Sequence, residues 1–142
     1  MMHGQFFQRL QRIDPIRRRL LIRALITLAG SSAAVAVLPF SRAIGFGGLP
    51  LGESGVAPPI ADVVWAVQAA ARRVPWRAKC IEQGLAVQRL LRKSGCDALL
   101  HYGARHEPSS GRLQAHVWIT VDGDTVIGGE EAREYKEIAT FP

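Results

Sequence analysis

Cysteine is scarce in this chain of 142 residues, which contains only Cys80 and Cys96. Two cysteines do not make the disulfide framework of a small secreted domain, and no Cys-x-x-Cys pair or His/Cys cluster predicts a zinc site. No internal repeat is visible, and the glycines between residues 45 and 55 lack the spacing of a phosphate-binding loop. We therefore expect free thiols in a reducing cytoplasm, with neither a bound metal ion nor a cofactor.

A basic surface is missing from most of the chain. The formal net charge is +6, but residues 1–23 hold six arginines against a single acidic residue, Asp14. The remaining residues carry 12 basic and 11 acidic side chains, so together they are close to neutral. A domain that binds nucleic acid needs a basic face on the folded unit. The charge distribution therefore argues against nucleic acid as a partner.

The N-terminal segment differs in composition from the rest of the chain. Residues 6–21 are basic and amphipathic, and residues 24–40 form an uncharged, mostly apolar run at the lower limit of length for spanning a bilayer. Three interpretations are open: a secretory or twin-arginine signal, a membrane anchor, and a helical hairpin that packs on the domain or on a partner. We favour the hairpin, and expect a cytoplasmic protein that is able to contact a membrane through residues 1–40.

Glycine and proline divide the chain into three predicted segments. Residues 45–59 are rich in both residue types, which is typical of a linker. The sequence thus predicts a basic and apolar helical segment over residues 1–44, a linker over 45–59 and a folded domain over 60–142.

Hydrophobic periodicity changes from helical to strand-like within the predicted domain. Apolar residues recur at helical spacing from Ile60, and again from residue 76 or 77 to Lys93. Gly95 is placed to end the second helix, and beyond it the alternation has a period of two. The alternating stretches are residues 98–103, 115–121 and 125–127, and they predict an antiparallel sheet with a tight turn at Asp122-Gly123. Helices followed by such a sheet indicate an α+β fold.

Cys80 and His116 are the candidate catalytic residues. A cysteine attacks as its thiolate, and an unperturbed thiol with a pKa of about 8.5 is mostly protonated at neutral pH. A helix N-terminus and an adjacent imidazole both favour the thiolate, and Cys80 lies in the first turn of the second predicted helix. His116 shares a strand face with Trp118, whose ring could shield the pair from water. The residues alone leave two interpretations open, a nucleophile with its base or a core cysteine and a structural histidine.

Short motifs around both residues resemble one family. Residues 74–80 (Val-Pro-Trp-Arg-Ala-Lys-Cys), with the Leu-Ala, Leu-Leu and Gly that follow, resemble the nucleophile helix of lasso-peptide B proteins. Residues 116–118 (His-Val-Trp) and 121–123 (Val-Asp-Gly) are similar to the later part of that family. The resemblance covers residues 60–142 and extends to the apolar N-terminal segment. It implies a papain-like or transglutaminase-like domain in which Cys80 is the nucleophile and His116 its base.

The resemblance implies a cysteine peptidase that removes the leader from a ribosomally made lasso-peptide precursor. Members of the family depend on a leader-binding domain, fused or separate, and pass the core peptide to an ATP-dependent cyclase. We expect the split form here, with the precursor leader, a separate leader-binding protein and the lasso cyclase as partners. The alternative is a non-catalytic scaffold of the same fold that presents the precursor to the cyclase.

The third member of the catalytic triad departs from the family pattern. The family has an aspartate twelve residues after the histidine, where this chain has Gly128. Asp122 lies at the tip of the predicted hairpin, roughly 20 Å from His116 along the strand. Folding the strand back brings Gly128 or Gly129 opposite His116, which makes Glu130 the nearest carboxylate and leaves Glu131 less well placed. The candidates to orient the imidazole are Glu130, Asp122, a backbone carbonyl and a side-chain amide such as that of Gln114.

Overall fold

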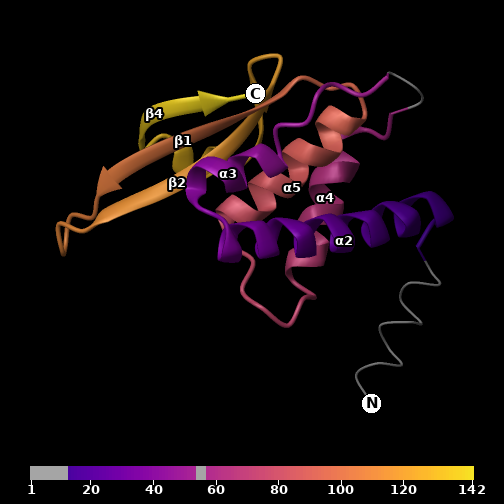
Figure 1. Ribbon diagram of the computed structural model, residues 1–142, viewed down its shortest axis with the longest axis horizontal. Coiled ribbons are helices and arrows are strands. Elements are labelled where there is room, and N and C mark those ends of the chain that lie inside the picture. The colour runs from indigo at the N-terminus through magenta and orange to yellow at the C-terminus, as the bar shows by residue number, and fades with distance from the viewer. Residues whose placement is uncertain (1–12, 54–56) are drawn as a thin grey trace.

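The computed structural model describes residues 13–53 and 57–142, which form helices packed on an antiparallel sheet (Figure 1). The α+β fold predicted from the sequence is therefore confirmed. The helical elements are α2 (Pro15–Val37), α3 (Phe40–Ala43), the 3-10 helix η1 (Ile44–Phe46), α4 (Ile60–Ala71), α5 (Cys80–Lys93) and α6 (Gly129–Ala132). The strands are β1 (Ala98–His106), β2 (Leu113–Val121), β3 (Asp124–Ile127) and β4 (Lys136–Phe141).

The four strands lie in the order β3-β2-β1-β4, and each neighbouring pair is antiparallel. The tight turn predicted at Asp122-Gly123 joins β2 to β3, and both residues have positive φ angles, of 51° and 84°. Two positive φ angles match the twist of the flanking strands, which explains the Asp-Gly pair at this turn. The longer hairpin between β1 and β2 extends away from the helices (Figure 1).

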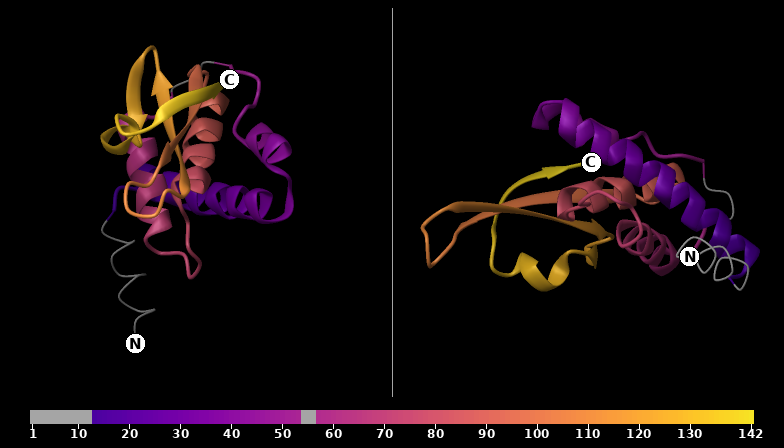
Figure 2. Two further views of the ribbon diagram at one scale, coloured as in Figure 1. Left: turned by 90° about the vertical axis from the view of Figure 1, so that its left-hand side faces the viewer. Right: turned by 90° about the horizontal axis from the view of Figure 1, so that it is seen from below.

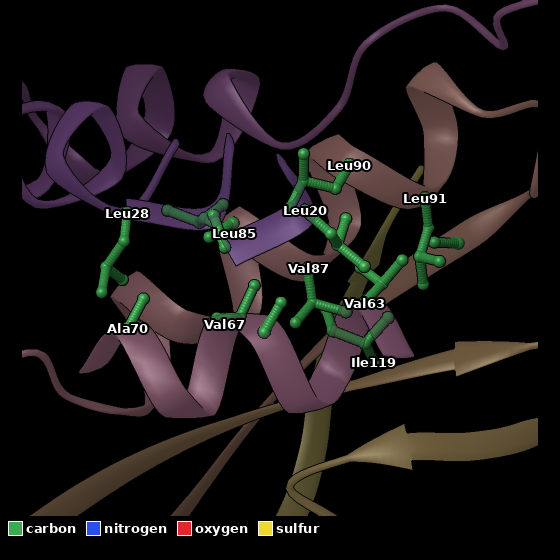
Figure 3. Packing of buried hydrophobic residues seen from close by; sticks show 14 of the residues in the cluster. Leu20, Leu28, Val63, Val67, Ala70, Leu85, Val87, Leu90, Leu91 and Ile119 are labelled. Carbon is green, nitrogen blue, oxygen red and sulfur yellow. The ribbon is translucent and has the colours of Figure 1, made fainter. Parts of the chain in front are cut away.

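One hydrophobic core joins α2, α4 and α5 to the inner face of the sheet (Figure 3). Helix α5 approaches β2 closely at Gly84, where an added Cβ would lie 3.1 Å from Cγ2 of Val117. The fully buried side chains come from all of these elements: Leu21, Leu28, Val63, Val67, Leu85, Val87, Leu91, Leu100 and Ile119. Because α2 supplies Leu21 and Leu28, the core includes residues on both sides of the predicted linker.

The N-terminal segment, expected as a helical hairpin, consists within the described residues of the long helix α2 followed by the short α3 and η1. Helix α2 begins at Pro15, after Asp14 accepts a hydrogen bond from the N–H of Ile16, and runs without a break to Val37. No proline interrupts the chain between Pro15 and Pro39, so nothing ends the helix near Arg23. The part of the prediction that falls on residues 1–12 lies outside the described residues.

Helix α2 is long enough to span a membrane, and its most apolar 18-residue stretch has a mean hydropathy of 1.9. It nevertheless packs against α4 and α5, and lies at the outside of the molecule (Figure 2). Its outward face carries large apolar side chains that are exposed: Ile16, Ile22, Ile26 and Val37. The protein thus has an apolar N-terminal helix, and one face of this helix is packed against α4 and α5.

Candidate active site

Cys80 is the first residue of α5, and its side chain is exposed. The helix begins three or four residues later than the sequence suggested, because a loop runs from the end of α4 to Lys79. The carboxylate of Glu82 accepts the N–H of Lys79 at 3.1 Å and so fixes the start of the helix. The thiol therefore lies at a helix N-terminus, where the dipole and the unpaired N–H groups favour an anion.

Helix α2 supports the first turn of α5 from the other side. The hydroxyl of Ser31, which is fully buried, donates a hydrogen bond of 2.6 Å to the carbonyl of Glu82. The indole N–H of Trp76, in the loop before Cys80, donates to the hydroxyl of Ser32 at 2.9 Å. These two bonds tie both the loop and the first turn of α5 to α2, so the position of Cys80 depends on the N-terminal helix.

His116 lies on β2 and is 5% exposed. Its Nε2 donates a hydrogen bond of 2.8 Å to the carbonyl oxygen of Gly128. A carbonyl can only accept, so Nε2 carries the proton in the neutral ring, and Nδ1 is the basic nitrogen. The backbone of Gly128 thus holds the ring in one tautomer. Gly128 is the position at which the family that the motifs resemble has an aspartate.

Two aromatic rings cover the imidazole. The ring of Trp118 stacks with it at a centroid distance of 6.1 Å and an angle of 22°. The ring of Tyr135 lies 5.1 Å away on a tilted plane, and the guanidinium of Arg105 lies 4.8 Å from the Tyr135 ring centre. The shielding expected of Trp118 is therefore reinforced by Tyr135, which the sequence analysis did not identify.

Cys80 and His116 line the same open pocket, which has a volume of about 550 Å³. The pocket lies between the start of α5, the strands β2 and β3, and the turn into α6. Within the described residues, Sγ of Cys80 makes no hydrogen bond to His116. Contacts between catalytic groups are often long before substrate binds and tighten afterwards. Both predicted residues therefore line the pocket, although they make no hydrogen bond to each other.

Glu131 supplies the carboxylate that reaches the imidazole, with Oε2 3.7 Å from Nδ1 of His116. Glu130 lines the pocket without such a contact, and Asp122 lies in the turn at the far end of β2. The return strand predicted over residues 125–127 ends at Ile127, and Gly128 then adopts a left-handed backbone with φ of 81° before α6 begins. Side chains no longer alternate in a helix, so the strand register that favoured Glu130 does not extend to it, and Glu131 makes the contact with His116.

The remaining amide candidate, Gln114, is engaged elsewhere. Its side-chain oxygen accepts a hydrogen bond of 2.9 Å from Nε of Arg105. Two other glutamines were overlooked, since Gln68 of α4 and Gln83 of α5 both line the pocket. The helical spacing that placed Cys80 at the start of α5 could have indicated Gln83, because it lies one turn further along the same helix.

A second histidine extends the aromatic stack away from the pocket. The ring of His101 stacks on Trp118 at 5.5 Å and an angle of 8°, and its Nε2 bonds with the hydroxyl of Thr120. The hydrogen bond from His101 and a second one from Thr140 lower the pKa of Glu137. Among residues 13–53 and 57–142 there is no group of three or more His, Cys, Asp or Glu side chains placed to hold a metal ion.

Comparison with known proteins identifies the family. A model of the transglutaminase-like superfamily matches residues 49–140, which is more than half of the chain and includes both Cys80 and His116. Comparisons with curated proteins and with solved structures gave no match. The matched range contains every strand and helix that lines the pocket, and Cys-His hydrolases are common in this superfamily. The chain belongs to the transglutaminase-like superfamily.

Proposed function

We propose that the protein is a cysteine peptidase that removes the leader from a lasso-peptide precursor. The observation that carries the proposal is the shared pocket, which is lined by a cysteine at a helix N-terminus and by a buried histidine of fixed tautomer. The superfamily supports Cys-His chemistry, and the motifs around Cys80 and His116 support the narrower lasso-peptide role.

The proposed mechanism follows from the different roles of the two imidazole nitrogens of His116. Nδ1 of His116 accepts the proton of the Cys80 thiol, and the thiolate attacks the peptide carbonyl. The backbone N–H of Cys80 has no acceptor within its own helix, and it can donate to the oxyanion. The imidazolium then protonates the leaving amine as the C–N bond breaks, and water, deprotonated by Nδ1, hydrolyses the thioester and frees the thiol.

Two groups assist the imidazole in this proposal. The Gly128 carbonyl keeps the proton on Nε2, which is the role the orienting carboxylate or amide has in other triads. The carboxylate of Glu131 lies 3.7 Å from Nδ1 and can pair with the imidazolium of the proposed mechanism, but it is 70% exposed, so solvent weakens this ion pair. The main-chain carbonyl is therefore the principal orienting group, and Glu131 is an auxiliary one.

The lasso-peptide role brings three partners into the proposal. These are the precursor leader, a separate leader-binding protein and the lasso cyclase. The exposed apolar side chains of α2 also offer a surface for a membrane, while its inner face stays packed on the domain. The protein in this proposal acts in the cytoplasm, with a membrane contact available through α2.

The alternative of a non-catalytic scaffold also has an observation in its favour. Sγ of Cys80 and His116 are not hydrogen-bonded in the described structure, and the residue that replaces the family aspartate has no side chain. A protein that only presented the precursor would need the fold and the pocket, but neither a thiolate nor a base.

The deciding experiment is to incubate the full chain with the precursor encoded next to it and the leader-binding protein, followed by mass spectrometry. We expect one cut at the junction of leader and core, and no cut with Cys80→Ala. The matched control is Cys96→Ala, because Cys96 lies in the connection between α5 and β1 and outside the pocket. An intact precursor with the native chain, under conditions where the precursor is bound, would support the scaffold instead.

A further inference from the structure

A second groove opens beside the candidate active site. It has a volume of about 320 Å³ and is lined almost entirely by apolar side chains: Ile60, Ala61, Val64, Trp65, Gln68 and Val126. Five of these residues lie on one face of α4, and Val126 lies on β3. The pocket that holds Cys80 and His116 is predominantly polar by contrast, with several charged and amide groups in its wall.

The groove adjoins the active-site pocket. Gln68 and Val126 line both cavities, so the passage that the proposal below requires between them lies at these two residues. From Gln68 the groove follows α4 back to Ile60, a rise of about 12 Å at 1.5 Å per residue. An extended peptide advances about 3.3 Å per residue, so a chain that passed the active site and followed the groove would place three or four residues along it.

The walls of the groove are braced before any substrate binds. The guanidinium of Arg17 lies 5.0 Å from the centre of the Trp65 ring and bonds to the carboxylate of Asp62 at 3.1 Å. On the opposite wall, β3 is the edge strand of the sheet, so within the described residues one side of its backbone has no strand partner. An extended peptide can add to such an edge while its side chains enter neighbouring pockets.

We propose that this groove is a specificity subsite that receives an apolar side chain of the precursor, two to four residues from the bond that Cys80 attacks. The inference rests on the proposed peptidase function, and it adds a requirement that the chemistry alone does not impose. The amide of Gln68, exposed at the passage, is placed to bond the peptide backbone between the scissile bond and that side chain.

The test fills the groove without disturbing the core. Ala61 is exposed and lines the groove, so Ala61→Phe blocks it, whereas Ala57→Phe makes the same change at an exposed alanine outside it. We expect Ala61→Phe to lower kcat/KM for the native precursor by about 10- to 100-fold, the range by which an apolar pocket discriminates, and Ala57→Phe to have little effect. Thermal unfolding of both variants shows that each is folded.

A scan of the precursor identifies the occupant. Each of the four residues on either side of the cleaved bond is changed to alanine in turn, and the native chain and Ala61→Phe are compared. At one apolar position, two to four residues from the bond, the alanine precursor should be cleaved equally slowly by both proteins, because both changes remove one contact. The subsite would be overturned if, at every precursor position, the alanine change and Ala61→Phe lowered the rate of cleavage independently, so that their effects multiplied. Full activity of Ala61→Phe would overturn it as well.

A measurement without catalysis separates this inference from the peptidase proposal. The Cys80→Ala chain is irradiated with the leader-binding protein and with precursors that carry the photoreactive residue benzoylphenylalanine, one variant at a time, at each apolar position within four residues of the leader–core junction. Crosslinking to residues 60–68 or to Val126 supports the groove even if the native chain never cuts the precursor. Cleavage by the native chain with no crosslink to these residues leaves the peptidase standing and removes the subsite.

Discussion

Gly128 has a left-handed backbone and lies close to β2, and an added side chain would be unfavourable on both counts. Its φ of 81° is strained for any residue with a Cβ, and its carbonyl holds Nε2 of His116. An added Cβ would lie 2.7 Å from the carbonyl oxygen of Val117, and 3.1 Å from both Cα and Cβ of Trp118. Gly128→Ala is therefore expected to strain the backbone and to push α6 away from β2.

The magnitude separates into two parts. The left-handed conformation costs about 1–2 kcal/mol once a Cβ is present. Crowding against β2 adds about 1–3 kcal/mol, because the atoms that the new Cβ meets are main-chain atoms and the Cβ of Trp118, none of which can rotate away. The sum of about 2–5 kcal/mol corresponds to a fall in Tm of roughly 6–15 °C for a chain of this size.

Gly123→Ala is the matched control, since Gly123 has a similar φ of 84° and no atom within 4 Å of the added Cβ. It should lose only the backbone part, about 1–2 kcal/mol. Urea unfolding of both variants measures the difference, which is the crowding at Gly128. Equal destabilisation of the two variants would refute the close approach. Gly128→Asp should likewise be destabilised and less active, and a gain in turnover would show that a family-like carboxylate can orient His116 after all.

Two further changes test α2 and the pocket. Leu28→Ala, at a fully buried side chain of α2, should destabilise the whole domain by about 2–5 kcal/mol in urea unfolding, whereas Ile26→Ala, at a side chain that is 69% exposed, should change it by less than about 0.5 kcal/mol. An unchanged stability of Leu28→Ala would mean that α2 is a detachable anchor or signal. Glu131→Gln should lower turnover by at most about fivefold, since an exposed ion pair contributes up to about 1 kcal/mol, and it should do so more than Glu130→Gln. A larger loss with Glu130→Gln would restore that residue as the partner of His116.

Regular elements with a clear period were predicted well from the sequence. Helix α4 begins at Ile60 as expected, and the Asp122-Gly123 turn connects the two strands that alternation indicated. Gly95, with φ of 89°, follows the end of α5 as a left-handed residue. In each case a local signal, an apolar stripe or a residue that tolerates positive φ, agrees with the tertiary structure.

The elements that were missed lack such a signal. Strand β4 has no apolar alternation, because most of its side chains are exposed at the sheet edge beside β1. Helix α6 has only four residues, too few to show a period. Since α6 decides which glutamate lies near His116, the contact made by Glu131 instead of Glu130 follows from one short element.

The candidate site was predicted in its residue types and only partly in its geometry. Position in a helix and on a strand indicated Cys80 and His116, and both line one pocket. The contact of His116 with a main-chain carbonyl could not be chosen from the sequence, because every residue has such a group. The division of the chain into residues 1–44, 45–59 and 60–142 stays a prediction. The catalytic roles of Cys80 and His116 stay predictions that an activity assay tests.

The acceptor that holds His116 belongs to the main chain, and this changes how the site can be altered genetically. No codon encodes the loss of a carbonyl, so a scan that replaces every acid and amide around the pocket would find no single essential third residue. The constraint on position 128 is conformational, since the residue there must tolerate the left-handed region. A search for the proposed triad by side-chain chemistry would therefore miss a partner that the backbone itself provides.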